Sequence, residues 1–306
     1  MLYIAKKLIL AIITIVIAVS LAVFLSNLGG DPVENILGPF APKAEVKAER
    51  HKLGLDRPLV VQVASTLGNV AQGNFGTSLE YERPCLQIIL GRLPASLELM
   101  AGALLIGLLI GLPLGIIAAL RPFTFVDRFV MSIAIFGYSV PLYWLSMIAV
   151  LVFAIDLRWL PAGLRGSPDH LVLPVLVLSA LPMGRIARIT RSSMITVLGE
   201  EYILAARARG LSRTRIVVGH GLRNAALPVI TVVGLLAGAL LSSAVTVEAV
   251  FAWPGIGSLA VDAVAFHDFR LVQAVVIFGA IVFVGINFIV DVIYTLLDPR
   301  IKAQAS

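Results

Sequence analysis

The sequence predicts an all-α integral membrane protein with six membrane-spanning helices. Of its 306 residues, 59% are apolar and only 14% are charged, whereas soluble domains average about 25% charged residues. The apolar residues also fall into six blocks, each near the roughly 20 residues that a helix needs to cross the hydrocarbon core. The blocks cover residues 8–28, 97–120, 129–155, 171–189, 228–250 and 271–297.

The first block has an alternative interpretation, because Lys6 and Lys7 before an apolar run also resemble the start of a secretory signal peptide. The block is longer than the roughly 7–15 apolar residues of a signal peptide, and no convincing small-x-small cleavage site follows it. We therefore expect a retained helix.

Residues 29–95 form the only long polar segment, which we expect to be a small external cap with short helices. A Lys- and Glu-rich stretch at 42–53 predicts one helix, and 64–70 and 86–93 are apolar enough to lie against the membrane surface. Cys85 is the only cysteine, so the chain has no internal disulfide and no thiolate metal site.

The later blocks carry helix-packing signals. Gly107, Gly111 and Gly115 recur every four positions in the second block, which predicts close contact with a neighbouring helix. The fourth block contains Pro174 and Pro182, and prolines in membrane helices favour kinks.

The distribution of Lys and Arg predicts that both termini are cytoplasmic. Eight arginines lie within 185–223, whereas the short loops on the other side carry only Arg158, Arg165 and Arg270. The long 29–95 segment does not decide the orientation, because long loops cross the membrane largely regardless of charge. The net charge of +6 is thus a topology signal, without the aromatic-interleaved basic runs of a nucleic-acid-binding surface.

The loop at residues 200–212, between the fourth and fifth blocks, predicts a helix, a tight corner and a second helix. Its acidic start at Glu200 and Glu201 and its basic end at Arg207 and Arg209 both agree with a helix macrodipole. Gly210 suits a left-handed residue that ends the helix.

The same loop suits insertion into a groove on a partner. Ser212 suits the cap of the next helix, and Ala205, Ala206 and Ala208 leave a narrow helix surface beside Tyr202. An ordinary positive-inside loop, whose arginines only fix the topology, is the alternative that composition leaves open.

These residues resemble the signature loop of the membrane subunits of binding-protein-dependent ABC importers, which reads Glu-Ala-Ala, three residues, then Gly, with a Leu-Pro further on. Ala205, Ala206 and Gly210 match, and Leu227-Pro228 supplies the end, but Leu204 stands where the family has Glu. That departure, and a longer distance to Leu-Pro, resemble the dipeptide/oligopeptide/nickel permease branch.

Further blocks resemble that branch along nearly the whole chain, including Glu201-Tyr202-Ile203 and the segment 220–228. The others are Gly30-Asp31-Pro32, 53–58, Gly76-Thr77-Ser78, 92–96, Val247-Glu248 with 251–257, and Leu297-Asp298-Pro299-Arg300.

The resemblance implies the type I ABC importer transmembrane fold. Residues 1–94 are then the first helix with the extracytoplasmic segment, 95–298 the permease domain and 299–306 a cytoplasmic tail. It further implies a multi-pass subunit of a bacterial or archaeal inner membrane. The implied partners are a homologous second permease, two cytoplasmic ATPases, an external solute-binding protein and the lipid bilayer, without nucleic acid.

The resemblance also assigns roles to residues. The ATPase-coupling loop comprises Glu201, Tyr202, Ala205, Ala206, Gly210, Leu211 and Ser212. The candidate external gate residues are Glu248, Phe251, Trp253 and Pro254, although a Trp followed by Pro-Gly is also a sufficient interfacial anchor and turn.

We expect no enzymatic activity and no cofactor on this chain. The sequence contains no Gly-Lys step, so it cannot build a Walker-type phosphate loop, and ATP and Mg²⁺ belong on the partner subunits. A membrane-embedded enzyme is a weaker alternative, because the chain has no His-Glu-x-x-His zinc motif. A gradient-driven transporter is another, but Glu98, Asp156 and Glu248 fall near predicted span ends and not near the midplane.

The transported solute stays open at this stage. The resemblance favours di- and oligopeptides, and nickel, glutathione or another small solute are the alternatives. Direct nickel binding favours clusters of His, Met or Cys, and the six Met residues are scattered. We therefore predict no metal site.

Overall fold

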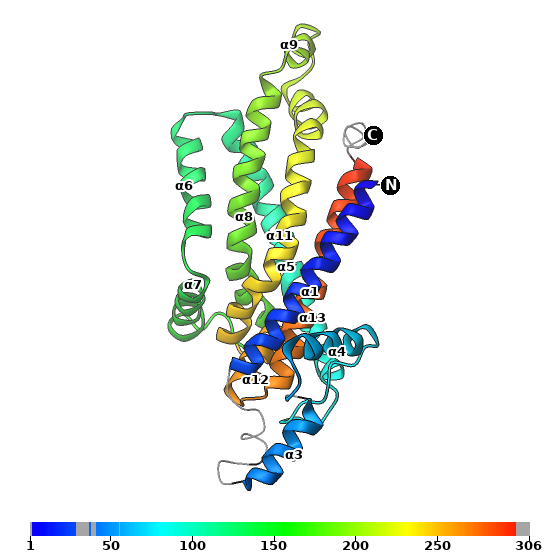
Figure 1. Cartoon of the computed structure of the whole chain (residues 1–306). Coiled ribbons are helices and arrows are strands. Elements are labelled where there is room, and N and C mark those ends of the chain that lie inside the picture. The colour runs from blue at the N-terminus through cyan, green and yellow to red at the C-terminus, as the bar shows by residue number, and fades with distance from the viewer. Residues whose placement is uncertain (1, 29–36, 38–40, 55, 298–306) are drawn as a thin grey trace. The chain divides into compact units, whose positions relative to one another are not determined.

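The computed structural model describes residues 2–28, 37, 41–54 and 56–297, and within these ranges it is built from helices (Figure 1). The chain divides into two compact units. One contains Met1–Ala95 and Pro254–Phe288, and the other contains Ser96–Trp253 and Ile289–Ser306. The predicted boundaries at 94 and 298 remain a prediction, and the predicted tail at 299–306 lies outside the described residues.

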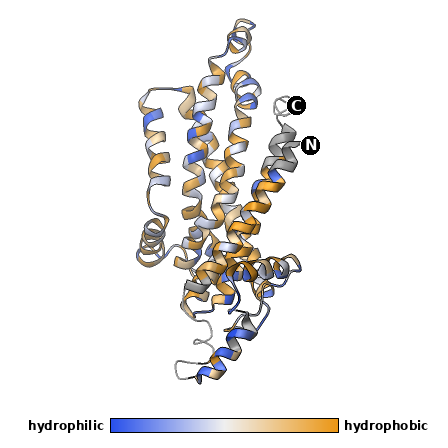
Figure 2. Ribbon diagram, viewed as in Figure 1, coloured by the Kyte–Doolittle hydropathy of each residue, from blue (hydrophilic) through white to orange (hydrophobic). Residues whose placement is uncertain are grey.

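The first unit contains α1 (Leu2–Leu28), α3 (Lys43–Leu53), α4 (Leu59–Ala71) and α12 (Ile256–Ala265). It also contains the start of α5 (Cys85–Leu120) and most of α13 (Phe269–Leu297). The predicted helix at 42–53 is confirmed as α3, which is mostly hydrophilic (Figure 2).

Apolar side chains of distant segments form the core of this unit. Cys85 and Ile89 of α5 pack with Leu259 of α12 and Leu271 of α13. A second cluster joins α1 to α13 through residues that include Val23 and Ile277. The predicted surface segment at 86–93 is not a separate helix, because it forms the first turns of α5.

The second unit contains the rest of α5, then α6 (Phe125–Ser139), α7 (Leu142–Ala149) and a π-helical turn, η1 (Val150–Asp156). These lead to α8 (Asp169–Leu198), α9 (Glu201–Ala208), α10 (Arg213–Arg215), a second π-helical turn, η2 (Ile216–Leu222), and α11 (Arg223–Val250). Figure 1 shows α6, α8 and α11 running side by side.

The glycines of α5 lie against α8, as their spacing predicts. A Cβ atom added to Gly111 would lie 2.6 Å from the carbonyl oxygen of Met183, and one added to Gly115 would lie 2.6 Å from that of Ala187. Real Cβ atoms do not approach other atoms so closely. Only glycine therefore allows the observed separation of the two helices.

The block at 129–155 is not the single straight helix that its apolar length predicts. It is broken between Ser139 and Leu142, and the two arms differ in direction by 100°. Pro141 explains the break, because it lacks an N–H group and forces Val140 out of helical geometry, to ψ 130°. Five described helices are long and apolar enough to cross a membrane, and the bent pair raises the number to six if it counts as one span.

Candidate functional site

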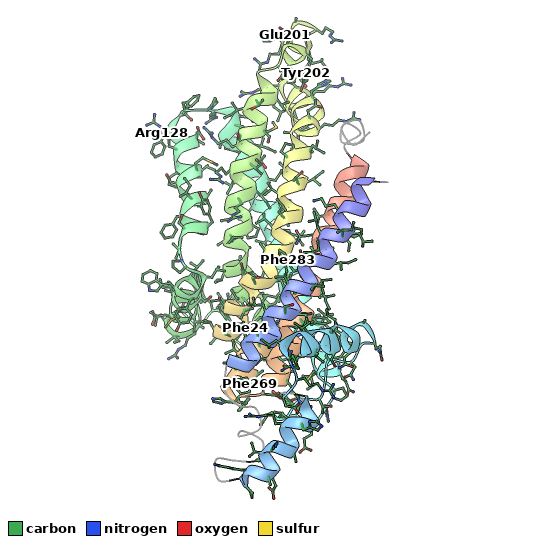
Figure 3. The ribbon with its side chains drawn as sticks, in the orientation of Figure 1. Phe24, Arg128, Glu201, Tyr202, Phe269 and Phe283 are labelled. Carbon is green, nitrogen blue, oxygen red and sulfur yellow. The ribbon has the colours of Figure 1, made fainter. Side chains whose placement is uncertain are left out.

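The 200–212 loop forms the predicted helix, corner and helix. α9 starts after Glu200 and ends at Ala208, in a segment that lies beyond the ends of α8 and α11 (Figure 1). Glu201 and Tyr202 lie in its first turn (Figure 3), and Arg207 lies in its last. The charges at both ends of α9 therefore have the signs that the helix dipole favours.

Gly210 forms the corner after α9 in a left-handed conformation, with φ 76°. Its N–H donates to the carbonyl oxygen of Arg207 at 2.9 Å, and the N–H of Leu211 donates to that of Ala206 at 3.3 Å. This hydrogen-bond pair defines a Schellman motif, which satisfies the last carbonyl groups of a helix. The motif confirms the predicted left-handed conformation of Gly210.

Ser212 begins the next helix. Its hydroxyl accepts a hydrogen bond from the N–H of Arg215 at 3.4 Å, and its carbonyl oxygen accepts from the N–H of Ile216 at 3.0 Å. The predicted cap is thus present. Because Gly210 and Ser212 are only two residues apart, the directions of both helices are set by local geometry.

One face of α9 packs against other residues of the same chain. Ile203 is fully buried and Ala206 is 3% exposed, and both pack with Ile216 and with the partly buried Leu198 and Leu211. The sequence places Ala206 on a surface offered to a partner, and the structure corrects this expectation, because Ala206 belongs to the inward face.

The opposite face of α9 is open. Leu204 is 58% exposed and Tyr202 is 42% exposed, and Glu201, Ala205 and Ala208 are exposed beside them. The hydroxyl of Tyr202 also accepts a hydrogen bond from the side chain of Asn224 at 3.1 Å. Leu204 is thus the most exposed large apolar residue of α9. It is also the residue at which the sequence departs from the Glu of the family motif.

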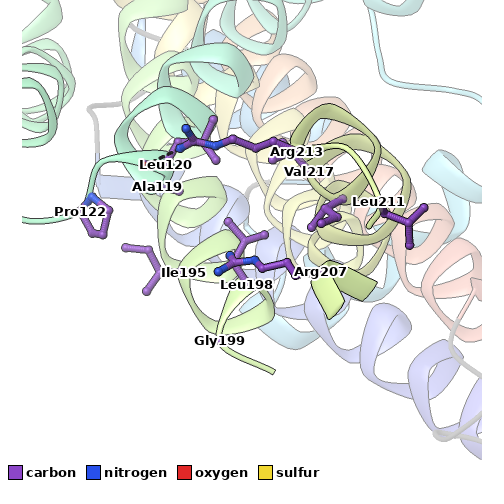
Figure 4. A pocket seen from close by; sticks show the side chains of 11 residues that line it. Ala119, Leu120, Pro122, Ile195, Leu198, Gly199, Arg207, Leu211, Arg213 and Val217 are labelled. Carbon is purple, nitrogen blue, oxygen red and sulfur yellow. Dashed lines mark hydrogen bonds between the residues drawn. The ribbon is translucent and has the colours of Figure 1, made fainter. Parts of the chain in front are cut away.

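A pocket of about 540 Å³ lies beneath α9, between the ends of α5 and α8 (Figure 4). Leu120 and Leu198 contribute apolar walls, and Arg207 and Arg213 line the pocket with their charged side chains. Arg213 also donates to the carbonyl oxygen of Leu120 at 3.3 Å. This bond ties the segment after the corner to the end of α5, a contact for which the sequence has no signal.

Three of the gate candidates lie at or just after the end of α11 and are buried. Glu248 is 1% exposed, and its side chain accepts a hydrogen bond from the Ser96 hydroxyl at 2.7 Å. Trp253 is also 1% exposed, and its N–H donates to the carbonyl oxygen of Glu248 at 2.9 Å. The fourth candidate, Pro254, follows in the chain and is half-buried.

Phe251 joins the turn after α11 to the loop that precedes α8. Its side chain is fully buried, and its carbonyl oxygen accepts a hydrogen bond from the N–H of Leu164 at 2.8 Å. A Cβ atom on Gly163 would collide with that carbonyl group. Gly163 and Ser96 are therefore contacts of the candidate gate that sequence reasoning did not identify.

Among the described residues, no group of three or more His, Cys, Asp and Glu side chains is placed to hold a metal ion. The acidic and basic side chains of the 200–212 loop are glutamates and arginines at opposite ends of α9.

The chain is similar to known transport proteins along most of its length. A family model described as "Binding-protein-dependent transport system inner membrane component" matches residues 111–303. The di/tripeptide transport system permease protein DppB of Pseudomonas aeruginosa is 39% identical over 304 residues, with 90% of each chain covered. The glutathione transport system permease protein GsiC of Salmonella typhimurium is 40% identical over 301 residues, with 98% of each chain covered.

A solved structure shares the fold. An inward-facing structure of the MetNI methionine ABC transporter contains a chain that superposes with a TM-score of 0.56 at 19% sequence identity. The match covers 70% of the present chain and 97% of that chain. The similarity extends the fold assignment to the type I importer architecture.

Proposed function

Because the chain belongs to the family of binding-protein-dependent transport system inner membrane components, it is a permease subunit of an ABC importer, and we propose that it forms half of a translocation pathway for short peptides. In this proposal the 200–212 loop receives the movement of ATPase subunits and transmits it to α8 and α11. ATP and Mg²⁺ bind to those partners, and this chain carries out no catalysis.

The proposal rests on the different exposure of the two faces of α9. Its inner face is fixed by Ile203 and Ala206, while Leu204 and Tyr202 are exposed on the outer face. A helix that is rigidly attached to its own subunit, and that exposes large apolar side chains on its free side, can transmit movement only if another protein contacts that side. The Schellman corner at Gly210 keeps this attachment stiff.

The partners follow from family membership. We propose that a homologous permease forms the other half of the pathway, that two ATPases bind on the side of the 200–212 loop, and that a solute-binding protein delivers the solute on the opposite side. Both termini are then cytoplasmic, in agreement with the Lys and Arg distribution.

Short peptides are the proposed solute class because the similar permeases are named for di- and tripeptides and for glutathione, which is itself a modified tripeptide. Glutathione is therefore the second candidate. Nickel or another small solute is a further alternative.

Purification of the chain in mild detergent from its native membrane tests the assembly. We expect mass spectrometry to find a homologous six-span subunit and one or two ATPases bound to it. If the chain is recovered without any ATPase, the coupling role of the 200–212 loop is wrong.

A surface substitution tests the loop itself. Leu204→Lys removes the most exposed large apolar side chain of α9 and places a positive charge where the family motif has Glu, without touching the buried face, so we expect the ATPases to dissociate while the permease still inserts. Phe125→Lys is the control, because Phe125 is 80% exposed but lies outside the loop. Equal retention of the ATPases by both variants contradicts the proposal.

A further inference from the structure

Three arginines follow one another at intervals of three along α8, and they differ in their partners. Arg191 donates two hydrogen bonds to Asp127, at 2.5 and 2.6 Å. Arg185 and Arg188 are exposed, and neither makes an ion pair with any residue that the structure describes. The guanidinium carbon of Arg188 lies 5.7 Å from the centre of the Tyr138 ring.

Both unpaired arginines lie within a helix that is long and apolar enough to span the membrane. Arg185 follows Asp169, the first residue of α8, by about 24 Å along the helix axis at 1.5 Å per residue. In a hydrocarbon core about 30 Å thick, this distance places both arginines toward the end of the span that leads to α9, in agreement with their place in the basic 185–223 segment. An Arg side chain there is still costly if it faces lipid tails, and charges within a span almost always face a protein interior, a water-filled cavity or the membrane interface. This face of α8 therefore belongs to a covered or hydrated region of the complete transporter.

A pocket of about 390 Å³ lies beside these arginines, between α8 and α11. Arg185, Arg188 and Ser192 contribute its polar groups, and Leu235 and Leu236 of α11 contribute apolar walls. Because the α8 residues of the pocket are spaced by three and four, they lie on one face of that helix. Cations and an apolar wall thus line the same pocket.

The helices α8 and α11 pack tightly at the base of the pocket. Ile186 of α8 is fully buried against Val229 and Leu236 of α11, so the two helices are packed together directly behind the arginines. Arg185 and Arg188 themselves remain exposed. A ligand can therefore reach them without separating the helices.

From this arrangement we infer that Arg185 and Arg188 bind the carboxylate group of the solute during its passage. The inference depends on the proposed function, because unmodified peptides and glutathione each carry at least one free carboxylate group. A guanidinium group presents paired donors that match a carboxylate, and Leu235 of α11, which is 56% exposed, offers an apolar surface for the rest of the solute. The exposure of both arginines keeps the site hydrated, which suits a group that has to be released.

The test measures ATP-driven uptake by the complete importer in liposomes. The probes are a radiolabelled tripeptide with a free C-terminal carboxylate and the same tripeptide as its C-terminal amide. The measured quantity is the ratio of the two uptake rates, for the wild type and for the double variant R185Q/R188Q. Since the same binding protein delivers both peptides in each case, its own preference cancels when the two ratios are compared.

We expect the double variant to lower this ratio about tenfold, as for the loss of a charge-assisted hydrogen bond. R185K/R188K retains the charge and should restore part of the ratio. R121Q removes one arginine that does not line the pocket and should leave the ratio unchanged. ATP hydrolysis stimulated by the binding protein should persist in every variant.

Three results would overturn the inference. If the wild type takes up peptide but the double variant has an unchanged ratio, the carboxylate site is wrong while the proposed function stands. If the double variant lowers the uptake of both peptides equally, and only in liposomes that contain phosphatidylglycerol, the arginines bind lipid phosphate. If the wild type takes up neither peptide, the proposed solute class is wrong and the inference fails with it.

Discussion

The side chain of Asp268 accepts a hydrogen bond from the hydroxyl of Ser78 at 2.5 Å, which joins two segments 190 residues apart in the sequence. The same carboxylate also accepts from the backbone N–H groups of Leu79, Glu80 and Leu271, at 2.9, 3.3 and 3.0 Å. Both Ser78 and Asp268 are almost completely buried. A single carboxylate thus fixes the turn after α4 to the start of α13.

Asp268→Ala should destabilise this unit, because it leaves the Ser78 hydroxyl and three N–H groups without their acceptor. Hydrogen bonds to a charged group contribute about 1.5–3 kcal/mol each, so we expect a clear fall in melting temperature in detergent. Glu80→Gln is the control, since the Glu80 side chain is exposed in the same turn. An equal melting temperature for D268A and E80Q would falsify the anchoring role.

Gly111→Ala should push α5 and α8 apart. The added Cβ atom would meet the Met183 carbonyl oxygen at 2.6 Å, and a backbone group cannot move aside alone. Overpacking of this kind costs about 1–3 kcal/mol. Gly91→Ala in the same helix meets nothing within 4 Å and should be neutral or slightly stabilising. Thermal unfolding of both variants measures the contrast, which is absent if the helix contact is unimportant.

The sequence predicts these contacts to different degrees. The apolar blocks other than 129–155, the small-residue spacing of α5 and the corner at Gly210 are local patterns, and the structure agrees with each of them. The bend at Pro141 is also a local signal, but the apolar length of the block hides it, because hydropathy does not register a change of direction.

Contacts between distant segments have no such local signal. Ser78 and Asp268 meet only because α12 and α13 return to the segment that follows α4. The burial of Ala206 depends on Ile216, which lies across the corner. Composition cannot assign a helix face when both faces contain alanine, so the inward position of Ala206 required the packed structure.

Arg191→Leu should destabilise the second unit by breaking its pair with Asp127, whose side chain is only 4% exposed. Removing one partner of a buried ion pair costs about 3–5 kcal/mol, because the other charge remains uncompensated. The double variant D127N/R191L should recover part of this loss. Melting temperatures of the two single variants and the double variant form a cycle, and strictly additive losses would show that the two residues do not interact.

Gly210→Pro should uncouple ATP hydrolysis from uptake while the protein still inserts. Proline fixes φ near −65°, whereas Gly210 has φ 76°, and its N–H, which proline lacks, donates to Arg207. The substitution therefore removes the Schellman corner, and α9 can move without carrying α8 and α11 with it.

A bulky side chain at Ala206 should have a related effect by another route. Ala206→Phe overfills the contact with Ile203 and Ile216 and lifts α9 from its base. Gly199→Ala is the control for both variants, because Gly199 has a right-handed conformation, with φ −85°, that alanine adopts readily. The measurement is the number of solute molecules imported per ATP hydrolysed by the reconstituted complex. We expect this number to fall for G210P and A206F and to stay constant for G199A. An unchanged number for G210P and A206F would mean that the movement of the ATPases reaches the pathway by a route other than the 200–212 loop.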